Sequence, residues 1–412
     1  MSRFLLVVPP LAGHIHPTVG LARELTARGH QVAWTGSEAV LRPLLGPDAT
    51  VLPTGSRIFR AQSGHGLGAL RTLWEGFIVP YARFTAKALD RVVTEYRPDV
   101  LLVDQHTPAG ALTAHRLGLS WASLAPGAME IGRPFRALPK VESWMTDQLT
   151  ALWLRAGLPP REYLDPRFSP ELVLALTAPA LTGAEPFPEQ YALVGPILTE
   201  RPADPSFPWE RLDPARRRVL LTMGTLAADV SADFHARAVR ALALLGDHVQ
   251  AVIAAPTQSL PLAELPSDAV AVERAPVLEL MSRGLLDAVV CHGGMNTVGE
   301  ALSHSIPLVV APIRHDQPFV AAQVQAAGAG LRVPFARVTP PGLAAALRAV
   351  LAGPGDGLGD GLGDGFRDGP CDGPAEGPDY RAAAARVGAG LRSGGGAPVA
   401  ADRLEALAGR AR

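Results

Sequence analysis

The sequence contains little cysteine and no excess of charge of either sign. Its 412 residues include only two cysteines, Cys291 and Cys371, so a network of disulfide bonds is excluded and a reducing, cytoplasmic location is expected. The 38 Lys and Arg residues are balanced by 39 Asp and Glu residues, which leaves a net charge of -1. Binding to a nucleic-acid backbone requires a basic excess, so we expect no nucleic acid among the partners.

Long apolar runs are also missing. A helix that spans a bilayer needs about 18 to 20 consecutive apolar residues, and no stretch of the chain reaches that length. The N-terminal run FLLVVPPLAG is interrupted by Pro9 and Pro10 and is too short for a signal peptide. We therefore predict no integral membrane segment and interpret residues 4–8 as a buried strand.

Short apolar runs that alternate with helical stretches predict the fold class. Continuous apolar strands separated by helices are typical of a parallel sheet covered on both faces. We predict an α/β protein with two Rossmann-like, doubly wound domains, the first with strand order 3-2-1-4-5. The expected strands are residues 4–8, 31–35, 50–52, 100–104 and 121–125 in the first half, and 219–223, 249–254, 269–273, 287–291 and 306–312 in the second.

A segment rich in proline and polar residues, 198–214, marks the expected domain boundary. Residues 353–378 repeat Gly-Asp pairs without the paired glycines of calcium-binding β-rolls, and we interpret them as a flexible low-complexity insert. The expected parts are an N-terminal domain over residues 1–200, a linker over 201–216, a C-terminal domain over 217–395, and a C-terminal helix over 396–412 that is a candidate to pack back on the N-terminal domain.

Two residues with acid–base chemistry follow strands that the predicted order makes neighbours. His14 and His16 lie in the turn after the first strand, and Pro17 marks the start of a helix expected over about residues 16–28. Asp104 ends the fourth strand. A carboxylate bonded to one imidazole nitrogen fixes the tautomer and leaves the other nitrogen free to accept a proton. We predict that His14 is a general base oriented by Asp104. In the alternative interpretation, His14 satisfies a backbone group in its turn and Asp104 caps the helix near Pro108.

The second half of the chain repeats the arrangement with a glycine-rich turn. Gly293 and Gly294 lead into a predicted helix, whose first backbone N–H groups can then approach an anion closely. Asn296 and Thr297 lie in the first turn of that helix, and Glu300, one turn further, is placed to accept hydrogen bonds from ribose hydroxyls. Alternatively, Asn296 or Thr297 is a simple N-cap.

An ordered pattern over residues 292–333, beginning HGGMNTVGEALSHSIPLVVAPIRHDQPF, resembles the donor-binding signature of the family 1 nucleotide-sugar glycosyltransferases. The similarity is greatest to their bacterial natural-product branch, which includes macrolide, polyketide and carotenoid enzymes. GHIHP at residues 13–17 resembles that family's Gly-His-x-x-Pro turn, and PDVLLVD at 98–104 resembles its strand ending in the paired Asp. The resemblance implies the GT-B fold, in which two Rossmann-like domains face a cleft.

The resemblance also implies roles for individual residues. His14 would deprotonate an acceptor hydroxyl with Asp104 as its partner. The residues implied for the donor are Thr225, His292, Gly293, Gly294, Asn296 and Thr297 for the diphosphate, Glu300 for the ribose, Asp316 and Gln317 for hydroxyls of the sugar, and Pro276 and Val277 for the base. The chain departs from the family pattern at Arg274, where an aromatic residue is usual, and at Val277, where glutamine is usual.

These features predict an inverting glycosyltransferase that moves a sugar from a UDP- or dTDP-sugar to a hydroxyl of an apolar small molecule, acting as a monomer or homodimer. No Asp-x-Asp motif occurs, so we expect no metal, and we expect no other cofactor. Aromatic residues in 73–84 and 142–154 belong either to an acceptor pocket or, more commonly for such spacing, to the core.

Other interpretations of the function stay open. These are a catalytically silent helper of the same fold, a lipid or carotenoid glycosyltransferase at the membrane surface, and a sugar-nucleotide 2-epimerase. A nicotinamide-dependent oxidoreductase is disfavoured, because the turn after the first strand lacks the Gly-x-Gly-x-x-Gly pattern.

Overall fold

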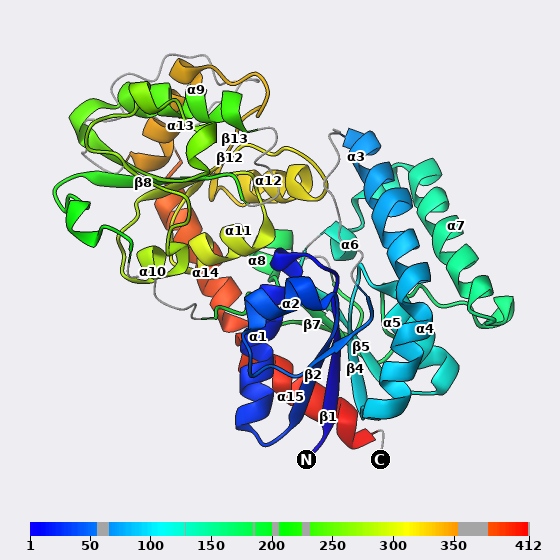
Figure 1. Cartoon of the computed structure of the whole chain (residues 1–412). Helices are drawn as coiled ribbons and strands as arrows, with labels where there is room; N and C mark the ends of the chain where they lie inside the picture. Colours follow the sequence, from blue (N-terminus) through cyan, green and yellow to red (C-terminus); the bar gives the residue numbers. More distant parts are fainter. Residues whose placement is uncertain are drawn as a thin grey trace. The chain divides into compact units, whose positions relative to one another are not determined.

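The computed structural model describes residues 1–55, 66–127, 129–183, 186–199, 206–224, 231–352 and 378–410 (Figure 1). The chain divides into two compact units. The first contains Met1–Thr199, Arg314–Asp316 and Arg392–Arg412, and the second contains Glu200–Ile313 and Gln317–Leu391. Apart from Pro378, the Gly-Asp repeat lies outside the described residues.

The first unit is built on a parallel sheet of seven strands in the order β3-β2-β1-β4-β5-β6-β7. The predicted order of the first five strands is confirmed. The two further strands, β6 and β7, were not predicted, although β6 lies within the apolar run LVLAL at residues 172–176. The strands are β1 (Arg3–Val7), β2 (Gln31–Gly36), β3 (Val51–Pro53), β4 (Val100–Asp104), β5 (Trp121–Ala125), β6 (Val173–Ala175) and β7 (Tyr191–Leu193).

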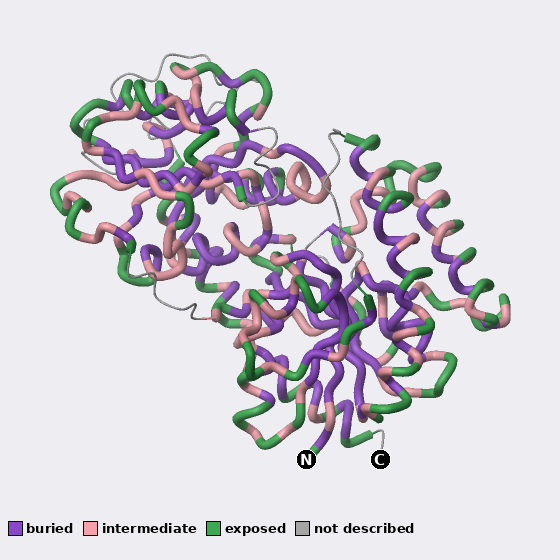
Figure 2. Tube along the Cα trace, viewed as in Figure 1, coloured by how far each residue is buried: buried purple, intermediate pink, exposed green. Residues whose placement is uncertain are grey.

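Helices pack around this sheet, and its central strands are buried over almost their whole length (Figure 2). A π-helical turn, Trp74–Ile78, joins α3 to α4, and a 3₁₀ turn, Pro134–Ala137, precedes α7. The helices are α1 (Ala12–Ala27), α2 (Glu38–Leu45), α3 (Gly66–Leu73), α4 (Val79–Tyr96), α5 (Pro108–Leu117), α6 (Met129–Gly132), α7 (Pro139–Arg155), α8 (Pro179–Thr182) and α15 (Gly396–Arg410).

The second unit repeats the plan with six parallel strands in the order β10-β9-β8-β11-β12-β13. The prediction of two doubly wound α/β sheets is therefore confirmed. The strands are β8 (Arg217–Thr222), β9 (Val249–Ala254), β10 (Val270–Val272), β11 (Ala288–Cys291), β12 (Leu308–Val310) and β13 (Gly330–Arg332). The helices are α9 (Ala232–Ala243), α10 (Val277–Ser282), α11 (Met295–Ser303), α12 (Gln317–Ala326), α13 (Pro340–Leu351) and α14 (Tyr380–Ser393).

The start of α1 differs from the prediction. Leu11 is extended, with φ -129 and ψ 115, and the helix begins directly after it. His14 and His16 therefore lie in the first turns of the helix, and the prediction that they occupy a turn is wrong. Pro17 suggested a helix start, but it lies inside α1, where it only removes one N–H donor from the backbone ladder.

The last helix, α15, belongs to the core of the first unit. Its apolar face, which includes Leu404 and Leu407, joins a buried cluster with Phe4 and Leu25. At the edge of this contact, the Arg28 guanidinium donates hydrogen bonds to carboxylates of α15. Among the described residues, no helix combines the length and the apolar character needed to cross a bilayer.

We predict that Leu404→Ala lowers the free energy of unfolding of the first unit by about 2–5 kcal/mol, because it leaves a cavity in a well-packed core. Leu404 is fully buried, at 0% exposure. The measurement is the urea midpoint of that unit's unfolding transition. Arg403→Ala, at the exposed neighbouring position, is the control and should change the midpoint little. Equal midpoints for the two variants would contradict the assignment of α15 to this core.

Candidate functional site

His14 and Asp104 form a hydrogen-bonded pair in the first unit. His14 lies in the first turn of α1, and Asp104 ends β4, which pairs directly with β1. The His14 Nδ1 and the Asp104 Oδ2 are 2.8 Å apart. Asp104 is fully buried, whereas 21% of the His14 side chain is exposed. With Nδ1 bonded to the carboxylate, Nε2 of His14 is the nitrogen that can accept a proton.

The second oxygen of Asp104 is bonded as well. Its Oδ1 accepts a hydrogen bond of 2.8 Å from the backbone N–H of His106. Thr107, not Asp104, occupies the N-cap of α5, and its hydroxyl donates to the backbone carbonyls of Asp104 and Val7. The alternative in which Asp104 caps α5 is therefore wrong, and the carboxylate instead joins the loop after β4 to the start of α1.

A second histidine, His106, packs against His14. The two ring centroids are 4.6 Å apart, and the ring planes are inclined by 36°. The Nε2 of His106 lies 3.3 Å from the Oε1 of Glu130 on α6. Sequence reasoning missed both residues: the motif DQH places a histidine two residues after Asp104, but nothing in the sequence links it to Glu130.

His106 and Glu130 form a buried hydrogen-bonded pair. Burial by itself lowers the pKa of His106, but the hydrogen bond that His106 donates to Glu130 and the negative charges of Glu130 and Asp104 outweigh it, so that the pKa is raised. Burial by itself raises the pKa of Glu130, but the hydrogen bond and charge of His106, with the charge of Arg167, lower it. Both shifts favour an imidazolium facing a carboxylate.

One nitrogen of each of the two imidazoles and one oxygen of Asp104 lie within 4.8 Å of one another. Two imidazoles and a carboxylate also occur as ligands of divalent metals. However, a metal bound through the His14 Nδ1 or the Asp104 Oδ2 would break their 2.8 Å hydrogen bond. We assign no metal to this group.

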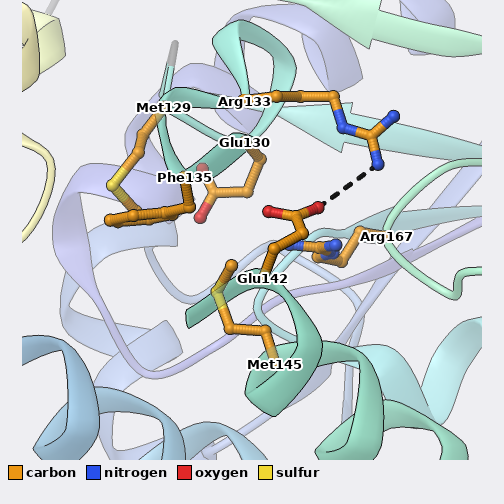
Figure 3. Close-up of a pocket in the computed structure, with 7 residues that line it drawn as sticks. All are labelled: Met129, Glu130, Arg133, Phe135, Glu142, Met145 and Arg167. Carbon is orange, nitrogen blue, oxygen red and sulfur yellow. Dashed lines mark hydrogen bonds and ion pairs between the residues drawn. The ribbon is translucent and has the colours of Figure 1, made fainter. Parts of the chain in front are cut away.

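Glu130 also lines a small pocket of the first unit (Figure 3), which has about 260 Å³ of empty space, part of it open to solvent. Figure 3 shows Arg133 and Glu142 joined by an ion pair of 3.4 Å. The pocket therefore has a polar, charged wall beside an apolar one. The residues that line it are Met129, Glu130, Arg133, Phe135, Glu142, Met145 and Arg167.

Arg167 is a buried cation of this pocket, with only 5% of the residue exposed. It is held by Asp165, with the Nη2 and Oδ2 atoms 2.7 Å apart, and its guanidinium lies over the rings of Trp74 and Phe168. Burial lowers the pKa of Arg167, but the bond to Asp165 outweighs it and raises the pKa. Arg167 is thus a charge fixed in place by its neighbours.

The aromatic residues considered for an acceptor pocket belong mostly to the core. Trp74, Phe77, Tyr81 and Trp153 are buried, Trp144 is partly exposed, and Phe84 is 47% exposed. None of them lines the pocket described above. The core interpretation of their helical spacing is therefore correct for those four residues, and the pocket is built instead from α6, α7 and the segments beside them.

In the second unit, His292 is enclosed by glycines. A Cβ atom placed on Gly294 would lie 2.6 Å from the His292 Nε2, and one placed on Gly224 would lie 2.6 Å from its Cε1. Gly293, with φ +89, would bring a Cβ to 2.9 Å from Val310. Only glycine fits these positions without displacement of a neighbour, so the glycines predicted to admit an anion also hold the imidazole at the start of α11.

The predicted polar residues of α11 lie as expected on its first turns. Gly294 is the N-cap and no side chain caps the helix, so the alternative in which Asn296 or Thr297 is the N-cap is wrong. Both are partly exposed in the first turn, whereas Glu300 is 7% exposed in the second. The N-cap of this helix is a glycine, which has no side-chain oxygen to offer the N–H groups of the first turn.

The remaining predicted donor residues lie on other segments. Pro276 is the N-cap of α10 and Val277 its first residue. Gln317 begins α12, and its Oε1 accepts a hydrogen bond of 2.9 Å from the Ile313 N–H. Asp316 belongs to the first unit, where burial, followed by the charge of Glu130, raises its pKa to about 6. Thr225 lies outside the described residues.

Comparison with known families gives a match over residues 209–355 to the model described as "UDP-glucoronosyl and UDP-glucosyl transferase". The chain is 30% identical to the zeaxanthin glucosyltransferase of Pseudescherichia vulneris over 377 residues, which cover 82% of the chain and 87% of that relative. It is 28% identical to the 4'-demethylrebeccamycin synthase of Lentzea aerocolonigenes over 406 residues, which cover 86% of the chain and 92% of the relative.

A solved structure shows the same fold. The spinosyn rhamnosyltransferase SpnG, in complex with thymidine diphosphate, superposes with a TM-score of 0.69 and 24% sequence identity. The match covers 95% of this chain and 96% of that one. The similarity therefore extends through both units.

We predict that Gly294→Ala destabilises the second unit by about 1–3 kcal/mol, because the added methyl group overpacks the His292 ring. The φ of Gly294 is -65, so the substitution adds volume without backbone strain. The measurement is the thermal midpoint of the second unit. Gly409→Ala, whose Cβ would meet nothing within 4 Å, is the control. A midpoint unchanged in both variants would show that His292 moves aside freely.

Proposed function

Since the chain belongs to the UDP-glucoronosyl and UDP-glucosyl transferase family and is a glycosyltransferase, we propose that it moves a sugar, with inversion, from a UDP- or dTDP-sugar to a hydroxyl of an apolar small molecule. The family resemblance predicted from the sequence is confirmed, as is the GT-B fold class. The names of the two relatives, a zeaxanthin glucosyltransferase and a 4'-demethylrebeccamycin synthase, support a secondary metabolite as acceptor.

One observation carries the proposed mechanism: the 2.8 Å bond between the His14 Nδ1 and the buried carboxylate of Asp104. In this arrangement the His14 Nε2 takes the proton of the acceptor hydroxyl. The acceptor oxygen then bonds to the anomeric carbon as the bond to the diphosphate breaks, and the diphosphate leaves with the electron pair. Asp104 keeps the imidazole in the required tautomer and stabilises the imidazolium that forms.

The departing diphosphate needs its own stabilisation, which we assign to the second unit. The first turn of α11 follows a glycine N-cap, which has no side chain to bond its backbone N–H groups, and the adjacent glycines permit a close approach. The donor-binding residues of the proposal are Thr225, His292, Gly293, Gly294, Asn296 and Thr297 for the diphosphate, Glu300 for the ribose, Pro276 and Val277 for the base, and Asp316 and Gln317 for the sugar.

Two other proposed functions have less support. A carotenoid acceptor, handled at a membrane surface, is favoured by the 30% identity to a zeaxanthin glucosyltransferase and is included among the acceptors to be tested. A catalytically silent helper has no need of an aligned acid–base pair, and the intact His14–Asp104 bond disfavours it.

We predict that His14→Ala lowers kcat by about 10²–10⁴-fold, the usual contribution of a general base. Asp104→Asn should also lower it, because an amide does not stabilise the imidazolium. Transfer from UDP-glucose and dTDP-sugars to a panel of hydroxylated apolar acceptors is measured by mass spectrometry, with nucleotide affinity measured in parallel. His248→Ala, at an exposed position, is the control. Unchanged transfer by His14→Ala would contradict the assignment of His14 as the general base. Absence of nucleotide binding by the wild type would favour the catalytically silent helper.

We also predict that turnover is undiminished in excess EDTA. In the proposed mechanism, N–H groups of α11 and the His292 side chain balance the charge of the diphosphate, so that no divalent cation is required. Rates are compared before chelation, after chelation, and after Mg²⁺ or Mn²⁺ is restored. A rate that collapses in EDTA and returns only with added metal would contradict the donor-site assignment.

A further inference from the structure

The His106–Glu130 pair has no part in the proposed mechanism, although it touches the proposed base. His106 lies in the loop between β4 and α5, and Glu130 lies on α6. The backbone N–H of His106 and the Nδ1 of His14 bind the two oxygens of the same carboxylate, each at 2.8 Å. The His106 ring then packs on the His14 ring with the centroids 4.6 Å apart. The backbone N–H and the ring of His106 thus both help to hold His14 in place.

The pair is built in a way that favours the protonated form of His106 beside His14. Only 13% of the His106 side chain and 9% of the Glu130 side chain are exposed, and their atoms approach to 3.3 Å. The Nδ1 of His106 is buried and has no hydrogen-bond partner among the described residues. A buried imidazolium with one unsatisfied N–H costs stability. Such a group is commonly retained for function, and here it packs on the ring of the proposed base.

We propose that His106, hydrogen-bonded to Glu130, is a positioning residue that holds the His14 ring for proton transfer. The inference rests on the proposed function. A protonated His106 makes a charge-assisted hydrogen bond to the Glu130 carboxylate, and loss of its proton would weaken that bond and loosen the ring that packs on His14. No proton leaves His106 during the reaction: the acceptor's proton goes to His14, and His106 only holds the ring of His14.

The charged groups that surround His106 come from several elements of the first unit. Asp104 on β4 and Glu130 on α6 are negative, and Asp316, whose pKa is about 6, is largely negative above that pH. His14 on α1 contributes its ring. His315 is neutral near pH 7, since burial and then the charge of Arg314 lower its pKa to about 4. Because the hydrogen bond to Glu130 raises the pKa of His106, its imidazolium should lose its proton above the ordinary histidine range.

The proposal predicts the alkaline side of the pH profile. With an aliphatic alcohol of the acceptor panel, whose hydroxyl does not ionise below about pH 10, kcat should fall as His106 loses its proton. His106→Phe keeps a stacked ring without charge, so we expect kcat to fall about 10–100-fold and the alkaline decline to vanish. Glu130→Gln removes the partner that raises the pKa of His106, so the decline should move to lower pH.

A double-variant comparison separates charge from packing. If Glu130 acts through His106, then Glu130→Gln should change kcat in the wild type but not in His106→Phe. The matched control is His115→Gln, which alters another histidine of the same unit at the far end of α5. Nucleotide affinity should stay unchanged in all of these variants, because none of the altered residues is assigned to the donor.

An NMR titration of the His106 ring in the wild type provides a test that needs no turnover, with the resonance assigned by its loss in His106→Phe. Titration clearly above the ordinary value of about 6.5, and lower in Glu130→Gln, supports the ion pair. Titration at or below the ordinary value overturns the proposal. A lower kcat with an unchanged pH profile in His106→Phe also overturns it and leaves a packing role only.

The failure of the proposed function would look different. If the wild type transferred sugar to no acceptor while the NMR titration still showed a raised value, the ion pair would stand and its role in transfer would be overturned together with the function. If transfer occurred and His106→Phe and Glu130→Gln both kept the wild-type rate, only the inference about His106 would fall.

Discussion

The carboxylate of Asp104 is completely buried at the end of β4, and a charge removed from water is tolerated only when its oxygens are bonded. The requirement is met from two directions, by the ring of His14 and by the backbone N–H of His106. The parallel pairing of β1 with β4 brings the start of α1 beside the end of β4. The order of the strands thus determines which histidine the buried charge orients, and the proposed chemistry of the first unit follows from that one contact.

Much of this fold could be predicted from the sequence, and the exceptions have physical reasons. Long apolar runs such as residues 4–8 and 100–104 were predicted as strands, whereas β13, whose residues are Gly, Leu and Arg, has no apolar run and was missed. The strand β6 was missed although it lies in the apolar run at residues 172–176. The start of α1 was placed too late because Pro17 resembles a helix N-terminus, although the surrounding helix accommodates it. Local patterns identify elements well but place their ends poorly.

In the candidate site, too, local sequence patterns predicted some contacts, and other contacts depend on the three-dimensional fold. His14 and Asp104 were predicted to meet because both follow strands that the fold makes neighbours, and they do. The contact between His106 and Glu130 depends on the path of the loop after β5, and no periodicity in the sequence predicts that path. In the second unit, the glycines at 293 and 294 were interpreted as room for an anion. Their second role, as space for the His292 ring, becomes visible only in three dimensions.

The assignment of α15 to the first unit has a consequence for biosynthesis. The chain leaves that unit after Thr199 and, apart from Arg314–Asp316, returns to it only at Arg392, so nearly all of the second unit is inserted within the first. A ribosome adding about 5–20 residues per second therefore takes roughly 10 to 40 seconds to make the insertion. During that time the surface that α15 will cover, which includes Phe4 and Leu25, lacks its partner. The synthesis of the first unit therefore begins first, but its core is completed only after α15 has emerged from the ribosome.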